Sequence, residues 1–119
     1  MDKDTKIDDL KEKVQKFCEA RDWDQFHNPK DLAIMLITET SELLEIFRYK
    51  NEEEVKEIMN GKKRVEVEEE VADIMFGLLR FAQMNDIDIS SVLKDKLIKN
   101  EKKYPADLVR GKNKKYNEY

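Results

Sequence analysis

The sequence has little of what builds tight loops, sheets or cross-linked scaffolds. Its 119 residues include three glycines, two prolines and one cysteine. The single cysteine, Cys18, excludes an internal disulfide framework and is compatible with a reducing compartment. No apolar run approaches the roughly 18 residues of a membrane span, and the start, Met-Asp-Lys-Asp, does not resemble a signal peptide. We therefore expect one cytoplasmic domain over residues 1–119, with no membrane partner.

Charge is abundant but unevenly distributed. Residues 1–93 carry 14 basic and 23 acidic side chains, whereas residues 94–119 carry nine basic and four acidic ones. An acidic body with a basic end, including a polar basic tail over about residues 106–119, is compatible with a nucleic-acid arm. It is equally compatible with an acidic metal centre in the body of the chain and basic side chains placed to bind a ligand that carries phosphate. Nucleic acid is the weaker alternative, because the tail lacks aromatic interleaving and the acidic body repels phosphate.

Apolar residues recur at helical spacing, and no alternation of period two is long enough to predict a strand. The sequence therefore predicts an all-α fold, an antiparallel four-helix bundle with a short extra helix. Aliphatic side chains also lie off the main stripes, which predicts that oligomerisation completes the core. The expected helices span about residues 5–20, 29–49, 52–59, 65–85 and 90–103, with Asn28, Asn51 and either Asp88 or Ser90 at helix starts and Gly61 at a helix end.

Two pairs of carboxylates lie within apolar helical stripes. At about 100° per residue, Glu39 falls in the middle of the stripe of its helix, and Glu42 falls on its shoulder. Glu70 and Asp73 repeat this arrangement on the next long helix. A carboxylate that points into a core must be neutralised, paired with a cation or bound to a metal. Four such oxygen donors facing each other favour a hard divalent ion, Mg²⁺ or Mn²⁺, and thereby phosphoryl or nucleotidyl chemistry.

These acids have two other interpretations. A ferritin-like di-iron bundle requires a Glu-x-x-His motif on each of two helices. This chain has one histidine, His27, and the acid three residues before it is Asp24 in a predicted loop, so the ligand count disfavours a di-iron site. The acids could also be solvated or salt-bridged groups of a non-catalytic helical module for oligomerisation or interaction. The two carboxylate pairs in apolar stripes favour the metal site.

The same residues carry a resemblance to a known family. Glu39-x-x-Glu42 followed by Glu70-x-x-Asp73 resembles the signature of the all-α nucleoside triphosphate pyrophosphohydrolases, the MazG-like group. The likeness to its dCTP pyrophosphatase branch covers about residues 7–116. It is carried by Trp23-Asp24-Gln25-Phe26-His27-Asn28-Pro29, Glu39-Thr40-Ser41-Glu42-Leu43, Glu69-Glu70-Val71-Ala72-Asp73-Ile74 and Lys102-Lys103-Tyr104-Pro105.

The resemblance implies an activity and roles for particular residues. The expected reaction is Mg²⁺-dependent hydrolysis between the α and β phosphates of a (d)NTP, with dCTP or a modified dCTP as the first expectation. The products would be a nucleoside monophosphate and pyrophosphate. By motif position Glu39, Glu42, Glu70 and Asp73 would bind the metal, and Trp23, His27, Tyr49, Lys96, Asn100 and Tyr104 would contact the nucleotide.

Some features of this expected enzyme stay open. Glu45 and Glu69 are candidates for the base that takes the proton of the attacking water, and the sequence does not choose between them. Tyr49 and Val14 stand where relatives in the branch carry tryptophan and histidine, so a broad or different base preference is an alternative. The protein is expected to be a homo-oligomer, either a dimer or a tetramer.

Overall fold

The computed structural model describes residues 1–118, and every α-helix or 3₁₀-helix found there belongs to one of two compact units. The all-α prediction is confirmed, since no strand occurs in this part of the chain. The first unit, Met1–Asp86, contains α1 (Ile7–Glu19), η1 (Asp24–Phe26), α2 (Pro29–Phe47), α3 (Glu52–Asn60) and α4 (Arg64–Met84). The second unit begins at Ile87 and contains α5 (Ile89–Lys103), α6 (Ala106–Val109) and η2 (Tyr116–Glu118).

Side chains at the helix ends explain where several helices begin. The Asn28 side chain accepts a hydrogen bond from the Asp31 backbone N–H at 2.9 Å, and Pro29 occupies the first turn of α2. Asn51 and Glu54 form a reciprocal capping box at α3. These contacts satisfy N–H groups that have no partner inside the helix, so the chain enters each helix at a defined residue.

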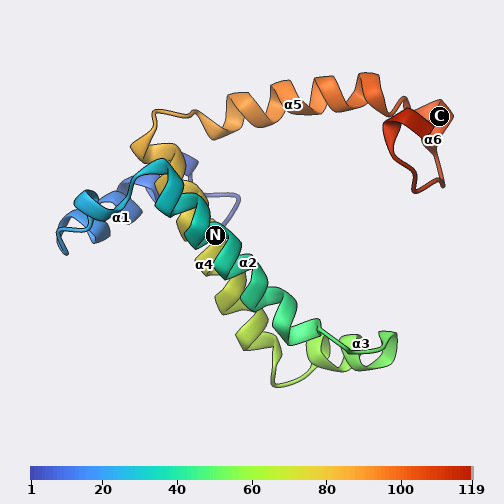
Figure 1. The fold of residues 1–119 in the computed structure, drawn as a ribbon, viewed down its shortest axis with the longest axis horizontal. Coiled ribbons are helices and arrows are strands. Elements are labelled where there is room, and N and C mark those ends of the chain that lie inside the picture. Colours follow the sequence, from blue (N-terminus) through green and yellow to red (C-terminus); the bar gives the residue numbers. More distant parts are fainter. Residues whose placement is uncertain (119) are drawn as a thin grey trace. The chain divides into compact units, whose positions relative to one another are not determined.

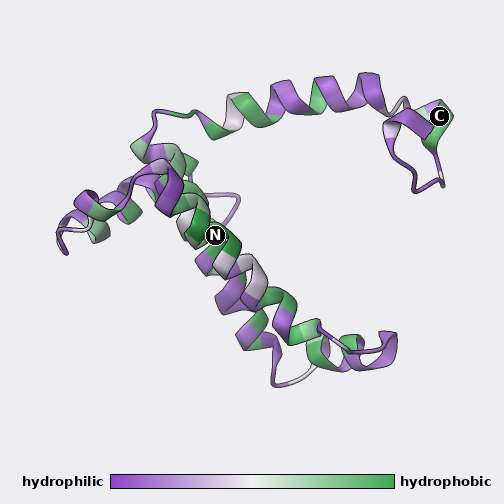
Figure 2. Ribbon diagram, in the orientation of Figure 1, coloured by the Kyte–Doolittle hydropathy of each residue, from purple (hydrophilic) through white to green (hydrophobic). Residues whose placement is uncertain are grey.

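The helices α2 and α4 lie side by side and run antiparallel (Figure 1). Hydrophobic residues recur along both of them (Figure 2). The two helices approach closely at Gly77, where an added Cβ would lie 3.0 Å from Leu36 Cδ2. The helices α1 and α3 also contact α4, so α4 is the element around which the first unit is built. The fully buried residues in this unit include Cys18, Leu32 and Arg80.

Many large apolar side chains of the first unit are exposed. On α2 they include Ile37, which is 70% exposed, and Leu44; on α4 they include Val71 and Leu78. The first unit by itself therefore leaves much aliphatic surface uncovered, as the sequence predicts for a protein that oligomerises. The oligomer itself stays a prediction.

The second unit has more structure than the sequence predicts. The fourth helix is confirmed as α5, with Asp88 as its capping residue. The tail after Pro105 is polar and weakly patterned in sequence, yet it forms α6 and η2. Within this unit the rings of Tyr104 and Tyr116 meet edge to face at 6.3 Å. The chain divides into two compact units, so the four-helix bundle, which needs α5, and the single domain over residues 1–119 stay predictions.

Among residues 1–118, no helix is both long enough and apolar enough to cross a membrane.

Candidate metal centre

Three carboxylates from two helices converge in the first unit. Glu39 comes from α2, and Glu70 and Asp73 come from α4; one oxygen of each lies within 4.8 Å of the others. The spacing of three residues places Glu70 and Asp73 on neighbouring positions of one helix face. The antiparallel partner helix then supplies Glu39 from the opposite side. The structure thus brings together three of the four acids that the sequence selects as metal ligands.

Two of these carboxylates are poorly satisfied by the protein. Glu39 and Glu70 are half-buried, whereas Asp73 is exposed. The Oε2 atoms of Glu39 and Glu70 are buried and have no hydrogen-bond partner. Burying a carboxylate oxygen without a partner costs free energy, so the fold holds these two atoms in place at the expense of stability.

Burial and mutual repulsion change the proton affinity of both groups. Burial raises the pKa of Glu39, and the nearby charges of Glu42 and Asp73 raise it further. Burial also raises the pKa of Glu70, and the adjacent Glu42 carboxylate adds to this effect. Like charges held together at the edge of an apolar region favour protonation or the binding of a cation.

The donor set fits a hard divalent cation. All the converging atoms are carboxylate oxygens, the ligands that Mg²⁺ and Mn²⁺ prefer, and no histidine or cysteine belongs to the cluster. The two buried oxygens without partners are the atoms that such an ion would satisfy. The residues present therefore fit a bound Mg²⁺.

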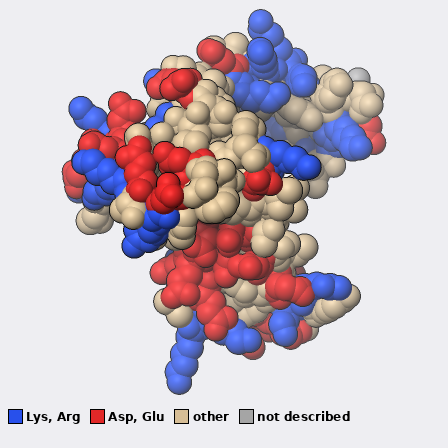
Figure 3. Space-filling view, turned by 60° about the vertical axis from the view of Figure 1, so that its left-hand side comes forward, with Lys and Arg blue, Asp and Glu red and all other residues tan. Residues whose placement is uncertain are grey.

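The remaining acids of the predicted site take different positions. Glu42 is exposed and is not one of the three acids whose oxygens lie within 4.8 Å of one another, but its side chain lies next to Glu39 and Glu70 and raises the pKa of both. Glu45 accepts hydrogen bonds from Arg48 Nη1 at 3.1 and 3.3 Å. Glu69 is exposed and lies beside Glu70. Figure 3 shows acidic side chains gathered densely on one face of the molecule.

The loop 23–27 carries the predicted nucleotide contacts Trp23 and His27 and is called the predicted substrate loop below. It is fixed to α4 by Arg80, a residue that is not among those predicted from the sequence. Arg80 is fully buried, and its Nε donates a hydrogen bond to His27 Nδ1 at 2.9 Å. The same guanidinium pairs with Asp24 through Nη2, and its Nη1 donates to Gln83 Oε1 at 2.6 Å. The Trp23 ring meets the His27 ring edge to face at 6.0 Å. A sequence signal for this anchor exists, because Arg80 is the one charged residue in the apolar run 74–82.

The other predicted substrate residues lie outside this loop. Tyr49 is 88% exposed and has a left-handed backbone conformation, with φ of 62°, just beyond the end of α2. Its hydroxyl accepts a hydrogen bond from Arg48 Nη2 at 2.9 Å. Lys96 and Asn100 lie on α5 and Tyr104 directly follows it, so all three belong to the second unit. Asn100 is half-buried and Lys96 is exposed.

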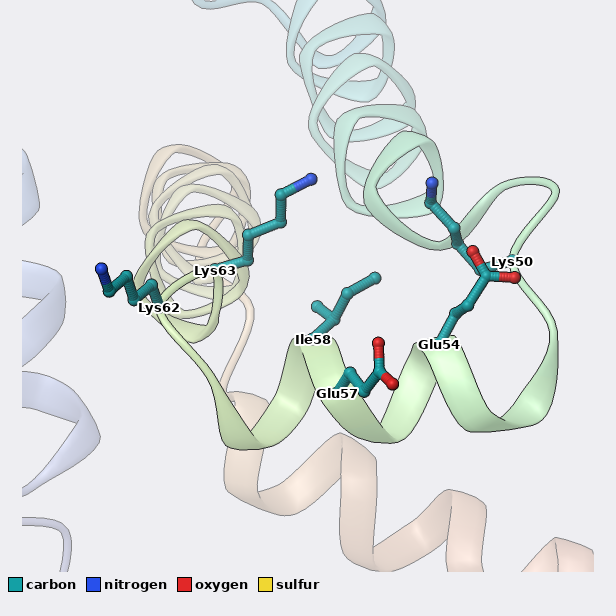
Figure 4. A pocket seen from close by; sticks show the side chains of 6 residues that line it. All are labelled: Lys50, Glu54, Glu57, Ile58, Lys62 and Lys63. Atoms are coloured by element: carbon teal, nitrogen blue, oxygen red, sulfur yellow. The ribbon is translucent and has the colours of Figure 1, made fainter.

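A hollow of about 260 Å³ lies elsewhere, beside α3. Figure 4 shows its lining, in which the Lys62 side chain points away from Lys63. None of the predicted site residues belongs to it, and its mixed charges indicate no single ligand chemistry. The converging acids of α2 and α4 are therefore the stronger candidate site. The residues that line the hollow are Lys50, Glu54, Glu57, Ile58, Lys62 and Lys63.

Comparisons with known proteins identify relatives of this chain. Residues 34–119 match the model of the MazG-like family. Human dCTP pyrophosphatase 1 is 31% identical over 113 residues, which cover 94% of this chain and 66% of that protein. The protein of the same name from Bos taurus is 32% identical over 111 residues, which cover 92% of this chain and 66% of that protein. The chain thus spans just under two thirds of the length of these relatives.

A solved structure is also similar. A pyrophosphatase from Archaeoglobus fulgidus superposes with a TM-score of 0.78 at 36% sequence identity. The match covers 82% of this chain and 91% of the other.

Proposed function

The chain belongs to the MazG-like family, and from this premise we propose that it is a metal-dependent nucleotide pyrophosphohydrolase. The proposed reaction hydrolyses a (d)NTP between the α and β phosphates to a monophosphate and pyrophosphate. The relatives named dCTP pyrophosphatase make dCTP, or a modified dCTP, the first substrate to test. The observation that carries the proposal is the convergence of Glu39, Glu70 and Asp73, with two buried oxygens that lack any partner.

The acids would hold the metal, and the metal would hold the triphosphate. Glu39, Glu70 and Asp73 are the proposed first ligands of Mg²⁺, with Glu42 beside them; Mn²⁺ is a chemically plausible substitute. When bound, the ion neutralises phosphate oxygens and lowers the pKa of a coordinated water. Because the protein supplies almost only oxygen anions here, an unaccompanied triphosphate would be repelled from this surface.

A further carboxylate would take the proton of the attacking water. Glu45 is one proposed base, but its carboxylate is engaged by Arg48 and would have to leave that ion pair first. Glu69 is the other, and it lies directly beside Glu70 in the sequence. Because Arg48 competes for the Glu45 carboxylate, both Glu45 and Glu69 should be tested as the base.

The nucleoside end would be bound by aromatic and polar side chains. Trp23 and His27 are already held together in one loop, and the exposed ring of Tyr49 is accessible to a base. Lys96, Asn100 and Tyr104 are the proposed contacts from the second unit, with Lys96 offsetting phosphate charge. We also propose a homo-oligomer, dimer or tetramer, on the basis of the exposed aliphatic side chains of α2 and α4.

The decisive experiment separates products as well as measuring turnover. Purified protein is incubated with each dNTP and Mg²⁺, and monophosphate, diphosphate, pyrophosphate and orthophosphate are resolved. Monophosphate plus pyrophosphate is the expected result; diphosphate plus orthophosphate would show that a different bond is cleaved. No turnover of any nucleotide would favour a non-catalytic interaction module, although such a module gives no reason for two buried, unpaired carboxylate oxygens.

Substitutions test the metal centre directly. Glu39→Gln and Glu70→Gln should each abolish turnover, with a loss of about a hundredfold or more, because each removes an anionic ligand. The matched control is Glu66→Gln, which makes the same change in the first turn of α4 outside the cluster. Full activity in either cluster variant, with circular dichroism unchanged, would remove these residues from the site.

A further inference from the structure

The guanidinium of Arg80 connects the predicted substrate loop to α4. It contacts three side chains at once: Asp24 and His27 from the loop, and Gln83 from its own helix. Arg80 is fully buried, whereas the side chain of Asp24 is 51% exposed. A buried guanidinium is tolerated when its N–H groups donate hydrogen bonds, because an unpaired buried charge is strongly unfavourable. Its contacts therefore hold the loop in one geometry.

The bond to His27 determines which ring nitrogen carries the proton. Arg80 Nε can only donate, so His27 Nδ1 must accept and must be unprotonated. A neutral imidazole with an unprotonated Nδ1 carries its proton on Nε2. Nε2–H faces away from the guanidinium, and His27 is only half-buried. The loop thus presents a hydrogen-bond donor of fixed orientation.

The anchor lies on the same face of α4 as the candidate metal ligands. Asp73, Gly77 and Arg80 are separated by four and three residues, which places them along one stripe of the helix. Seven residues of helix correspond to a rise of about 10 Å between Asp73 and Arg80. His27 is therefore held near one end of this stripe while the acids occupy the other. A nucleotide whose phosphates bind at the acids would have to span about this distance for its nucleoside end to meet His27.

We propose that Arg80 is a positioning residue, which holds His27 as a neutral imidazole so that Nε2–H donates to an acceptor oxygen of the nucleoside monophosphate part of the substrate. This inference rests on the proposed function. It adds to that function a role for His27 as a hydrogen-bond donor to the substrate and a role for Arg80 in fixing the tautomer and orientation of His27. Gln83 has the further role of holding the guanidinium from the helix side.

The charges around His27 are consistent with this state. Partial burial lowers the pKa of His27, and the Arg80 charge lowers it further, whereas Asp24 acts in the opposite direction. Cys18, the nearby thiol, is itself held protonated, because burial raises its pKa. A second positive charge next to Arg80 would be repelled, so protonation of His27 would break the anchor.

The first test reads the tautomer without reference to activity. His27 is the only histidine in the chain, so tag-free protein labelled with ¹⁵N gives one set of imidazole resonances. At pH 7 we expect Nδ1 at the unprotonated position and Nε2 at the protonated position, and we expect dCMP with Mg²⁺ to shift the Nε2–H signal. An Nδ1–H tautomer, a charged ring or an unchanged spectrum at saturating dCMP would overturn the proposal.

The second test separates positioning from general stability. His27→Asn keeps an acceptor near the Nδ1 position but loses the outward donor, so KM should rise about tenfold while kcat changes little. Arg80→Lys should also raise KM and should disturb the His27 resonances. In the double variant the two effects should not add, because one acts through the other.

The controls distinguish the two levels of the proposal. Arg64→Lys makes the same change at an exposed arginine of α4 that pairs with Glu68, and it should leave KM within about twofold. Additive losses in the double variant, or an Arg80→Lys protein with unchanged KM and spectrum, would contradict a positioning role. Absence of hydrolysis in the wild type would instead contradict the proposed function, while the tautomer and the dCMP response would still be measured.

Discussion

At the scale of single residues, the carboxylates of α2 and α4 are placed for binding rather than for stability. Their pKa values are raised, so the folded state binds protons more tightly than the unfolded state does. The stability that these groups contribute is fully present below their unfolded pKa and is lost as pH rises through the raised folded pKa. At neutral pH the metal-free protein therefore carries the cost of burying these two charged carboxylates, together with their repulsion by the neighbouring acids.

This cost gives a first prediction. Glu39→Gln should raise the melting temperature of the metal-free protein at pH 7 by a few degrees, and it should weaken the fall in stability as the pH rises above the ordinary pKa of a glutamate. Thermal unfolding followed by circular dichroism in the presence of a chelator measures both. Glu66→Gln should show neither effect; a lower melting temperature for Glu39→Gln would mean that the carboxylate is well satisfied in the absence of metal.

The choice of base gives a second prediction. If Glu69 takes the proton, Glu69→Gln should lower kcat about a hundredfold or more with little change in KM, and the acidic limb of the pH–rate profile should disappear. Glu45→Gln should then lower kcat only a few-fold, because the Glu45 carboxylate already pairs with Arg48. The opposite ranking of the two variants would assign the base to Glu45.

Single residues also show where sequence reasoning stops. The acids of the site could be chosen because carboxylates at helical spacing within an apolar stripe need an explanation. Arg80 was missed, although it too lies alone in an apolar run, since its partners Asp24 and His27 are more than 50 residues away. Helical periodicity describes one helix at a time and does not show which loop will reach it.

At the scale of elements, helix starts were more predictable than their surroundings. Asn28, Asn51 and Asp88 each accept a backbone hydrogen bond at a helix start, and local chemistry suffices to find them. The helix α6 was not predicted, because its four residues are too few to show a period. The spacing of α2 and α4 was also not predictable, since it depends on Gly77 meeting Leu36 from another helix.

That close approach gives a third prediction. Gly77→Val should destabilise the fold by about 1–3 kcal/mol, because the added methyl groups enter space occupied by Leu36 and force the helices apart. Separation of α2 and α4 would also spread Glu39 from Glu70 and Asp73, so the Mg²⁺ concentration needed for half-maximal activity should rise. Chemical denaturation and a metal titration measure the two effects. Equal metal dependence in the variant and the wild type would show that the helix spacing does not set the site.

At the scale of the whole molecule, the exposed aliphatic residues lead to a fourth prediction. Light scattering should give the mass of a dimer or tetramer, and Ile37→Lys should lower that mass, since a charge on a residue 70% exposed in the monomer costs little unless a partner covers it. Ile37→Val is the matched control. A monomeric mass for the wild type would remove the oligomer from the proposal.

The packing of the loop also provides an optical probe. Trp23 is the only tryptophan, and its ring lies 5.7 Å from Phe17 and 6.0 Å from His27. All indole emission therefore originates beside the proposed nucleoside contacts, so intrinsic fluorescence should respond when a nucleotide enters. Binding could then be followed in real time on the unlabelled chain, and stopped-flow traces would separate the arrival of the nucleotide from the cleavage that follows.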